Sequence, residues 1–277
     1  MAYHTRSNSF PSRPHPIIQE VEEHLCRLSS FEATSKSSSS ISNKLNGLQD
    51  LLHCVDRFLQ LQGTQQALAE EKQEKWANEL LDGSLWLLDI CSTAKDALSQ
   101  TKECMQDLQS IIRRKRGGEI GLTSEVRKYL SSRKMVKKSI HKAIGNLKEM
   151  KNRCRISSTN KDQETIAIVN KLRDVEAVTL TVFESVLSFI SGPKSKPSGW
   201  SFVSNIVQSK RIACDEETTV NEFSEVDAAL KSLKSAENAQ NQLSDLESCI
   251  QDQEEGLQCL FRQLIKTRVS LLNILSQ

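Results

Sequence analysis

Proline is confined to two short stretches of this 277-residue chain, and that distribution limits what the chain can fold into. All five prolines lie within 11–16 and 193–197. A proline inside a helix costs about 3 kcal/mol, because it removes a backbone donor and clashes with the preceding turn. The 176 residues from Ile17 to Gly192 contain none and are rich in Leu, Glu, Lys and Gln. We therefore expect helix almost throughout.

Apolar residues recur at the spacing of helices that pack side by side. Region 41–59 carries them four and three residues apart, and the last long helix carries them at intervals of seven: Leu243, Ile250, Leu257, Leu264 and Leu271. Region 166–190 is apolar on two opposite faces, which predicts a helix surrounded by neighbours. The pattern predicts an all-α fold, an elongated bundle of six to eight long helices with heptad-like seams. We expect these seams to be filled within one chain, and hence a monomer rather than a dimer.

Turn and capping residues predict where the helices begin and end. Residues 35–40 read as a loop, and Gly63 with Thr64 as a turn before a helix over 65–81, in which Trp76 is an apolar anchor. A separate helix is expected from Gly83 to Arg116. Thr123 or Ser124 is the expected cap of the following helix.

The same signals predict the domain organisation. Residues 1–16 are polar, without periodicity, and are expected to be a disordered tail. Residues 17–277 are expected to form a single helical-bundle domain, interrupted by a Pro, Gly, Ser and Lys linker at 191–199. The longest nearly apolar stretch, 178–190, is shorter than the roughly 20 residues of a membrane span. With no secretory leader recognised, we expect a cytoplasmic protein or one peripheral on the cytosolic face of a membrane.

Charge is distributed unevenly, although the net charge is only +2. Residues 113–155 hold 15 Lys and Arg against three acids, a net of +12, whereas residues 215–255 hold 12 acids against two Lys, a net of −10. The two blocks could neutralise each other inside one bundle. Alternatively, the first could be a basic surface for anionic lipid or nucleic acid.

Several short segments carry a family resemblance. They are Arg6-Ser7-Asn8-Ser9-Phe10-Pro11-Ser12-Arg13-Pro14-His15-Pro16, Trp200-Ser201-Phe202-Val203-Ser204, Ser209-Lys210-Arg211 and Val226-Asp227-Ala228-Ala229-Leu230. With the Leu-rich helices between them, the chain resembles the plant BYPASS-like family, catalogued as domain of unknown function 241. The resemblance implies an all-helical protein without known catalytic activity, associated with root and shoot development through control of a mobile signal. It implies no catalytic, cofactor-binding or metal-binding residues.

The N-terminal segment holds the strongest local motif. Arg6, Ser7, Ser9 and Pro11 are similar to the R-S-x-S-x-P ligand of 14-3-3 adaptors, which is bound once the second serine is phosphorylated. A phosphate on Ser9 would add a charge near −2 and three acceptor oxygens for an arginine cluster on the adaptor. The simpler alternative is an unmodified, solvated tail.

A second segment suggests contact with a membrane. It combines cations with large apolar residues: Lys194, Lys196, Trp200, Phe202, Lys210 and Arg211. In an interfacial helix the aromatic rings would enter the headgroup layer while the cations face anionic lipid. The alternative is a short helix that closes the bundle, with Trp200 in its core.

Motifs of catalysis are missing from the sequence. No P-loop, G-x-S-x-G, H-E-x-x-H or dinucleotide fingerprint occurs, and the eight cysteines form no C-x-x-C pair, so we expect no enzyme, cofactor or metal. His24, His53 and His141 are expected to be surface or packing residues. Nucleic acid is not an expected partner, since only Tyr129 interleaves the basic region as an aromatic. The expected function is a non-enzymatic helical interaction protein; the alternative is a peripheral membrane protein that binds anionic lipid through 194–211 and the basic helix 123–155.

Overall fold

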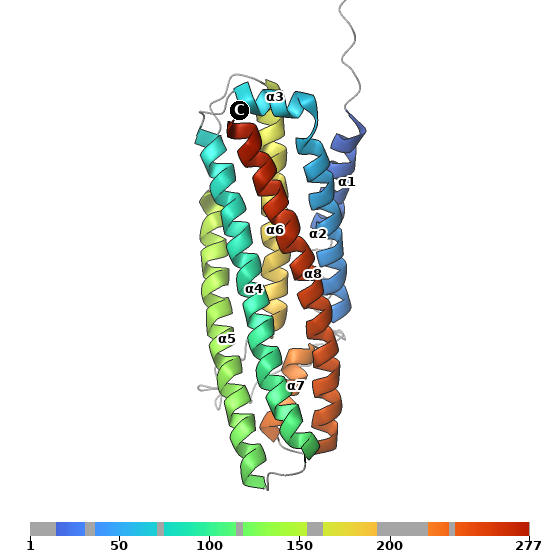
Figure 1. Cartoon of the computed structure of the whole chain (residues 1–277), viewed down its shortest axis with the longest axis vertical. Coiled ribbons are helices and arrows are strands. Elements are labelled where there is room, and N and C mark those ends of the chain that lie inside the picture. Colours follow the sequence, from blue (N-terminus) through green and yellow to red (C-terminus); the bar gives the residue numbers. More distant parts are fainter. Residues whose placement is uncertain are drawn as a thin grey trace, which may run out of the picture.

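The structure is a computed structural model that describes residues 15–30, 37–70, 75–114, 119–153, 163–192, 221–232 and 236–276. These residues form eight helices: α1 (Pro16–Ser30), α2 (Ser38–Leu59), α3 (Gln62–Glu70), α4 (Lys75–Arg114), α5 (Glu119–Arg153), α6 (Gln163–Ser191), α7 (Glu222–Ser232) and α8 (Ala236–Ser276). Figure 1 shows them as an elongated bundle. The prediction of an all-α bundle with six to eight helices is confirmed.

The long helices run along the length of the bundle, and α3 crosses one end of it near the C-terminus (Figure 1). Helix α8 packs between α4 and α2, with α5 on the other side of α4. Helix α6 contacts α1, α2, α3, α4, α5 and α7. Its two apolar faces are therefore both covered, which confirms the central position predicted for region 166–190.

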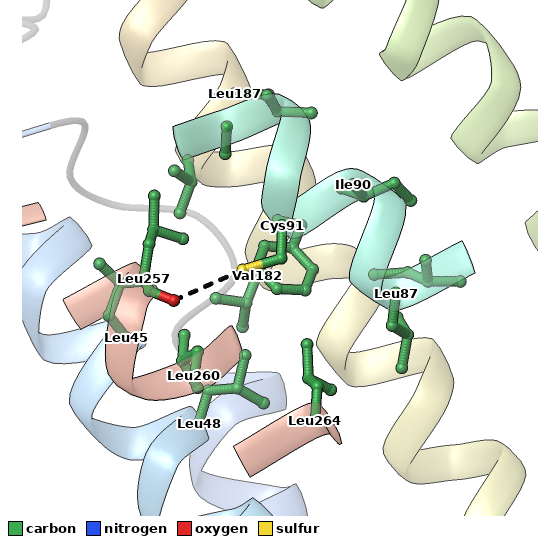
Figure 2. Packing of buried hydrophobic residues seen from close by; sticks show 14 of the residues in the cluster. Leu45, Leu48, Leu87, Ile90, Cys91, Val182, Leu187, Leu257, Leu260 and Leu264 are labelled. Atoms are coloured by element: carbon green, nitrogen blue, oxygen red, sulfur yellow. Dashed lines mark hydrogen bonds between the residues drawn. The ribbon is translucent and has the colours of Figure 1, made fainter. Parts of the chain in front are cut away.

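The heptad seam of the last helix lies in the core. Its five residues at intervals of seven are all buried, none more than 5% exposed. Figure 2 shows Leu257, Leu260 and Leu264 of α8 against Leu45 and Leu48 of α2 and a turn of α4. Burial of each such side chain contributes about 1.5–3 kcal/mol before the cost of ordering. The seam is filled by other helices of the same chain, as expected.

Gly83 is in the interior of α4, so the predicted helix start at this position is wrong. A Cβ atom added there would meet Oε1 of Glu176 on α6 at 2.4 Å. Glycine at this point lets the buried Glu176 carboxylate approach the backbone of α4. Glycine has a low helix propensity and so suggested a helix boundary at this position. In the structure Gly83 allows close packing, and α4 continues through it.

Three other predicted boundaries are also wrong. The chain turns at Gln60–Leu61, where both amides bond to carbonyls of the last turn of α2, and Gly63 and Thr64 already belong to α3. Thr123 and Ser124 lie inside α5, at positions that are not buried, where a hydroxyl costs a helix little. The predicted loop at 35–40 ends sooner, because the Ser37 side chain accepts from the Ser40 amide and caps α2.

Candidate functional site

The residues singled out as binding sites by the sequence lie outside the described residues. This holds for the phospho-docking set (Arg6, Ser7, Ser9, Pro11) and for the membrane-contact set (Lys194, Lys196, Trp200, Phe202, Lys210, Arg211). The tail 1–14 and most of the 191–199 linker are likewise outside them. The candidate sites that the structure positions are therefore on the helices themselves.

Among the hollows on the described part of the bundle surface, two are large. One of about 600 Å³ lies between α4 and α8 and is lined mostly by charged and polar residues, Lys95, Asp96, Glu254 and Arg262 among them. The other, about 910 Å³, lies at the end of the bundle between α1, α3 and α6, and its lining includes the apolar residues Ile18, Phe58 and Ile168. Its volume is within the range of small-molecule sites, which are usually more enclosed.

Of the histidines that the structure describes, His15 alone lines one of these two hollows. His15 lines the larger hollow, and its Nδ1 accepts from the amide of Ile17 at 3.3 Å. His53 and His141 are exposed on α2 and α5, and His24 contacts Arg27. Within the described part of the chain, no group of three or more His, Cys, Asp and Glu is placed to hold a metal ion. None of its helices is long and apolar enough to cross a bilayer.

The buried cysteines have unreactive thiols. Burial raises the pKa of Cys91 to about 12 and that of Cys249 to about 11, from an ordinary value of 9.0. Cys91 donates to the carbonyl of Leu257 at 3.5 Å, deep between α4 and α8 (Figure 2). At neutral pH these groups remain thiols, and the nucleophilic form of cysteine is the thiolate. They act as small packing residues in the core.

A buried arginine is the centre of the main polar cluster. Arg133 of α5 is 2% exposed, and its Nε lies 3.3 Å from Oδ1 of Asp227 on α7. Its Nη2 donates to the carbonyl of Ile190, near the end of α6, at 2.8 Å, and its Nη1 to Thr101 on α4 at 3.4 Å. One guanidinium thus connects four helices. Such a charge is tolerated in a core only when it is paired and hydrogen-bonded, as here.

Further contacts fix α7 against this cluster. Phe223 stacks under the Arg133 guanidinium at 4.9 Å, and its ring meets that of Phe189 edge-on at 5.5 Å. Asn221 caps α7 and donates to the carbonyl of Phe189 at 2.9 Å. Burial raises the pKa of Tyr129, and the adjacent Asp227 carboxylate adds to the increase, so this phenol stays neutral. The cluster is occupied by contacts within the fold, which makes it a structural joint.

The outer side of α5 is strongly basic. Arg127, Lys134, Lys138, Lys142 and Lys148 are exposed and fall within about 120° of the helix circumference, and we call them the basic face. No described acidic residue forms an ion pair with any of the five, whereas the neighbouring Lys128 pairs with Asp107 and Glu125. Met135, the most exposed large apolar residue described, lies beside this face at 59% exposure.

The first interpretation of the charge blocks, that they neutralise each other inside one bundle, holds in part. Arg133 and Lys137 are neutralised by Asp227, at 3.3 and 2.8 Å, so the blocks do meet inside the bundle. The basic face points away from the bundle and remains charged. The opposite charges of the two blocks in the sequence indicated that acidic and basic residues pair, but they did not indicate which residues do so. Helical periodicity places Arg133 between the apolar Tyr129 and Val136, and this is the signal that could have indicated its burial.

Comparison with protein-family models gives a match over most of the chain. The model of the protein family described as Protein BPS1 matches residues 44–274, which is 231 of the 277 residues. No curated protein and no solved structure shows a significant match to the chain. The matched span runs from α2 to α8 and includes the core, the Arg133 cluster and the basic face. The chain therefore belongs to the BPS1 family, the plant family related to development that its sequence resembles.

Proposed function

We propose that this protein is a non-enzymatic interaction protein of plant development, which acts in the cytoplasm by binding other proteins. Its family is related to plant development. The observation that carries the proposal is the division between the inside and the outside of the bundle. The buried charged groups Arg133 and Asp227 are used up in holding helices together, while exposed charged and apolar residues form ordered surfaces on α4, α5 and α8.

One interaction within this proposal is specific enough to test directly. Ser9 phosphorylation would create a 14-3-3 ligand from Arg6, Ser7, Ser9 and Pro11. The test is binding of the full chain, phosphorylated or not, to a purified 14-3-3 protein by biolayer interferometry. We expect binding only after phosphorylation, its loss in Ser9→Ala, and its retention in a control variant. The control replaces a serine outside the motif, Ser12→Ala. Equal binding of both forms of the protein would refute this interaction.

The basic face supports a second candidate, a peripheral protein on the cytosolic face of a membrane. Each cation near an anionic bilayer contributes about 1 kcal/mol, so five on one face are sufficient for reversible attachment. Their arrangement along α5 lets all five approach a flat surface together, and Met135 beside them could enter the headgroup layer. The segment 194–211 would add its own cations and aromatic rings.

Sedimentation with vesicles separates this candidate from the first. We expect binding to vesicles that contain phosphatidylserine, no binding to pure phosphatidylcholine, and loss of binding at high salt. The triple variant Lys134→Gln, Lys138→Gln, Lys142→Gln should release the protein. A matched control removes the same charge at exposed cations of three other helices: Arg27, Arg114 and Lys231. Equal binding of the two triple variants would exclude the basic face as the contact.

A further inference from the structure

The exposed apolar residues are concentrated on one strip of the bundle surface. Among the described residues, six large apolar side chains are exposed, and four of them border the line where α4 and α8 meet: Leu85, Ile265, Val269 and Leu272, at 46%, 41%, 48% and 41% exposure. The half-buried Leu81, Leu88 and Phe261 belong to the same two helix segments. We call these seven residues the outer strip. Trp86 is about 100° further round α4 from Leu85 and is not part of it.

Side-chain bonds define how the two helices of the outer strip are aligned. Arg268 of α8 donates to Ser84 of α4 at 2.6 Å, and Lys102 of α4 pairs with Glu254 of α8 at 2.6 Å. The helices are therefore antiparallel: positions with increasing residue number along α4 lie beside positions with decreasing residue number along α8. Leu85 is level with the interval between Ile265 and Val269. The spacing of Ile265, Val269 and Leu272, four and then three, is that of a helix with a packing partner.

Charges beside the outer strip are complementary between its two helices. Asp82 and Asp89 are exposed on α4 and form no ion pair with a described residue. Arg262 is exposed on α8 and likewise forms no ion pair with a described residue. Asp89 is five residues beyond Ser84, and Arg262 is six residues before Arg268, so the two lie at the same height on neighbouring helices. The acidic pair on α4 and the single cation Arg262 on α8 make a surface that complements itself at this height.

We propose that the outer strip is a docking surface for a second copy of this chain. A two-fold axis parallel to the bundle places α8 of each copy against α4 of the other and keeps every residue at its own height. Leu85 of one copy then meets Ile265 and Val269 of the other, and Asp89 meets Arg262. Both contacts occur twice, and the arrangement closes as a dimer instead of growing into a fibre.

Like charges limit the extent of this interface. Beyond Arg262 the same arrangement would bring Asp96 of one copy towards Glu255 of the other, at the charged hollow between α4 and α8. The contact therefore ends there. The contact spans about twelve residues along each of two helices, at a rise near 1.5 Å per residue and a width near 10 Å per helix. It therefore buries roughly 350 Å² per copy. Stable complexes bury about 800 Å² per partner, so we expect a reversible dimer with a Kd of about 10–100 µM.

Analytical ultracentrifugation of the full chain from about 1 to 500 µM tests the proposal. We expect the mass to rise from 31.2 kDa towards twice that value. Val269→Glu should weaken the dimer more than about tenfold, because two carboxylates enter an apolar contact. Met135→Glu, a change on the exposed surface of α5, is the matched control and should leave the Kd unchanged. A wild-type chain that remains monomeric throughout, or a Val269→Glu dimer of unchanged Kd, overturns the proposal.

A charge exchange tests the pairing of α8 with α4 independently of the apolar contacts. Asp89→Arg alone and Arg262→Asp alone each create two repulsive contacts, and each should weaken the dimer about five- to tenfold. The double variant restores opposite charges across the interface and should recover wild-type affinity. Both positions are exposed, so folding is expected to be retained, and far-UV circular dichroism checks this. A double variant as weak as the single variants overturns the two-fold arrangement.

Discussion

Removal of the Asp227 carboxylate is the sharpest test of how this bundle is held together. Asp227→Ala leaves the Arg133 guanidinium, which is 2% exposed, without its counter-charge. Breaking a buried pair from one side costs about 3–5 kcal/mol. Arg133 keeps its bonds to Ile190 and Thr101, and Lys137, with 32% of its side chain exposed, can turn to solvent. We therefore expect a loss of about 3 kcal/mol in the free energy of unfolding.

Comparison with two further variants isolates the cause. Lys137→Ala removes only the half-exposed partner and should cost about 1 kcal/mol or less. The double variant Arg133→Met, Asp227→Ala removes both buried charges and should be more stable than Asp227→Ala alone by about 2 kcal/mol, although it loses the bond to Ile190. Urea unfolding followed by circular dichroism at 222 nm measures each value, with the m-value as a check on the transition. A double variant no more stable than Asp227→Ala alone would refute the reasoning.

Two other predictions concern backbone packing and pH. Gly83→Ala should destabilise the protein by about 1–2 kcal/mol, because the added Cβ displaces the buried Glu176 carboxylate. The control Gly145→Ala, on the open surface of α5, should stabilise the protein by up to about 1 kcal/mol. A gain of stability in both variants would show that the Glu176 carboxylate moves without cost. The raised pKa values of Cys91 and Cys249 favour the protonated thiol in the folded state, so stability is complete below pH 9 and falls as pH rises towards 11. Between pH 9 and 11 each thiol lowers the free energy of unfolding by about 1.4 kcal/mol per pH unit. Urea midpoints measured across that range should therefore depend less on pH in Cys91→Ala than in the wild type. An equal pH dependence in the two proteins would contradict this prediction.

The local sequence was sufficient for the architecture but misleading at particular residues. The proline-free run and the heptad seam of α8 predicted long helices that pack side by side, and the two apolar faces of α6 predicted its central position. Gly83 was interpreted as a boundary because glycine weakens a helix interior. Its actual role depends on Glu176, which is 93 residues away in the chain and adjacent in space.

The candidate sites show the same division. The sequence contained a basic block and an acidic block, and it could not tell a cation that points inward from one that points outward. Only the packing of α5 against α4, α6 and α7 separates Arg133 from the basic face. Likewise, periodicity identified the inner seam of α8, whereas the outer strip became visible once the neighbours of Ile265, Val269 and Leu272 were known.

Helix formation, seam spacing and family membership are properties of residues near one another in the chain, and the sequence by itself determined them. Which side of each helix meets solvent, which charges are paired and which glycine admits a neighbour were decided only by the tertiary structure. The physical reason is that burial and pairing are energies between helices. These energies depend on which helix surfaces the bundle brings together. The 3.6-residue period of an apolar stripe is the same whichever neighbouring helix covers that stripe, so the sequence pattern cannot identify the neighbour.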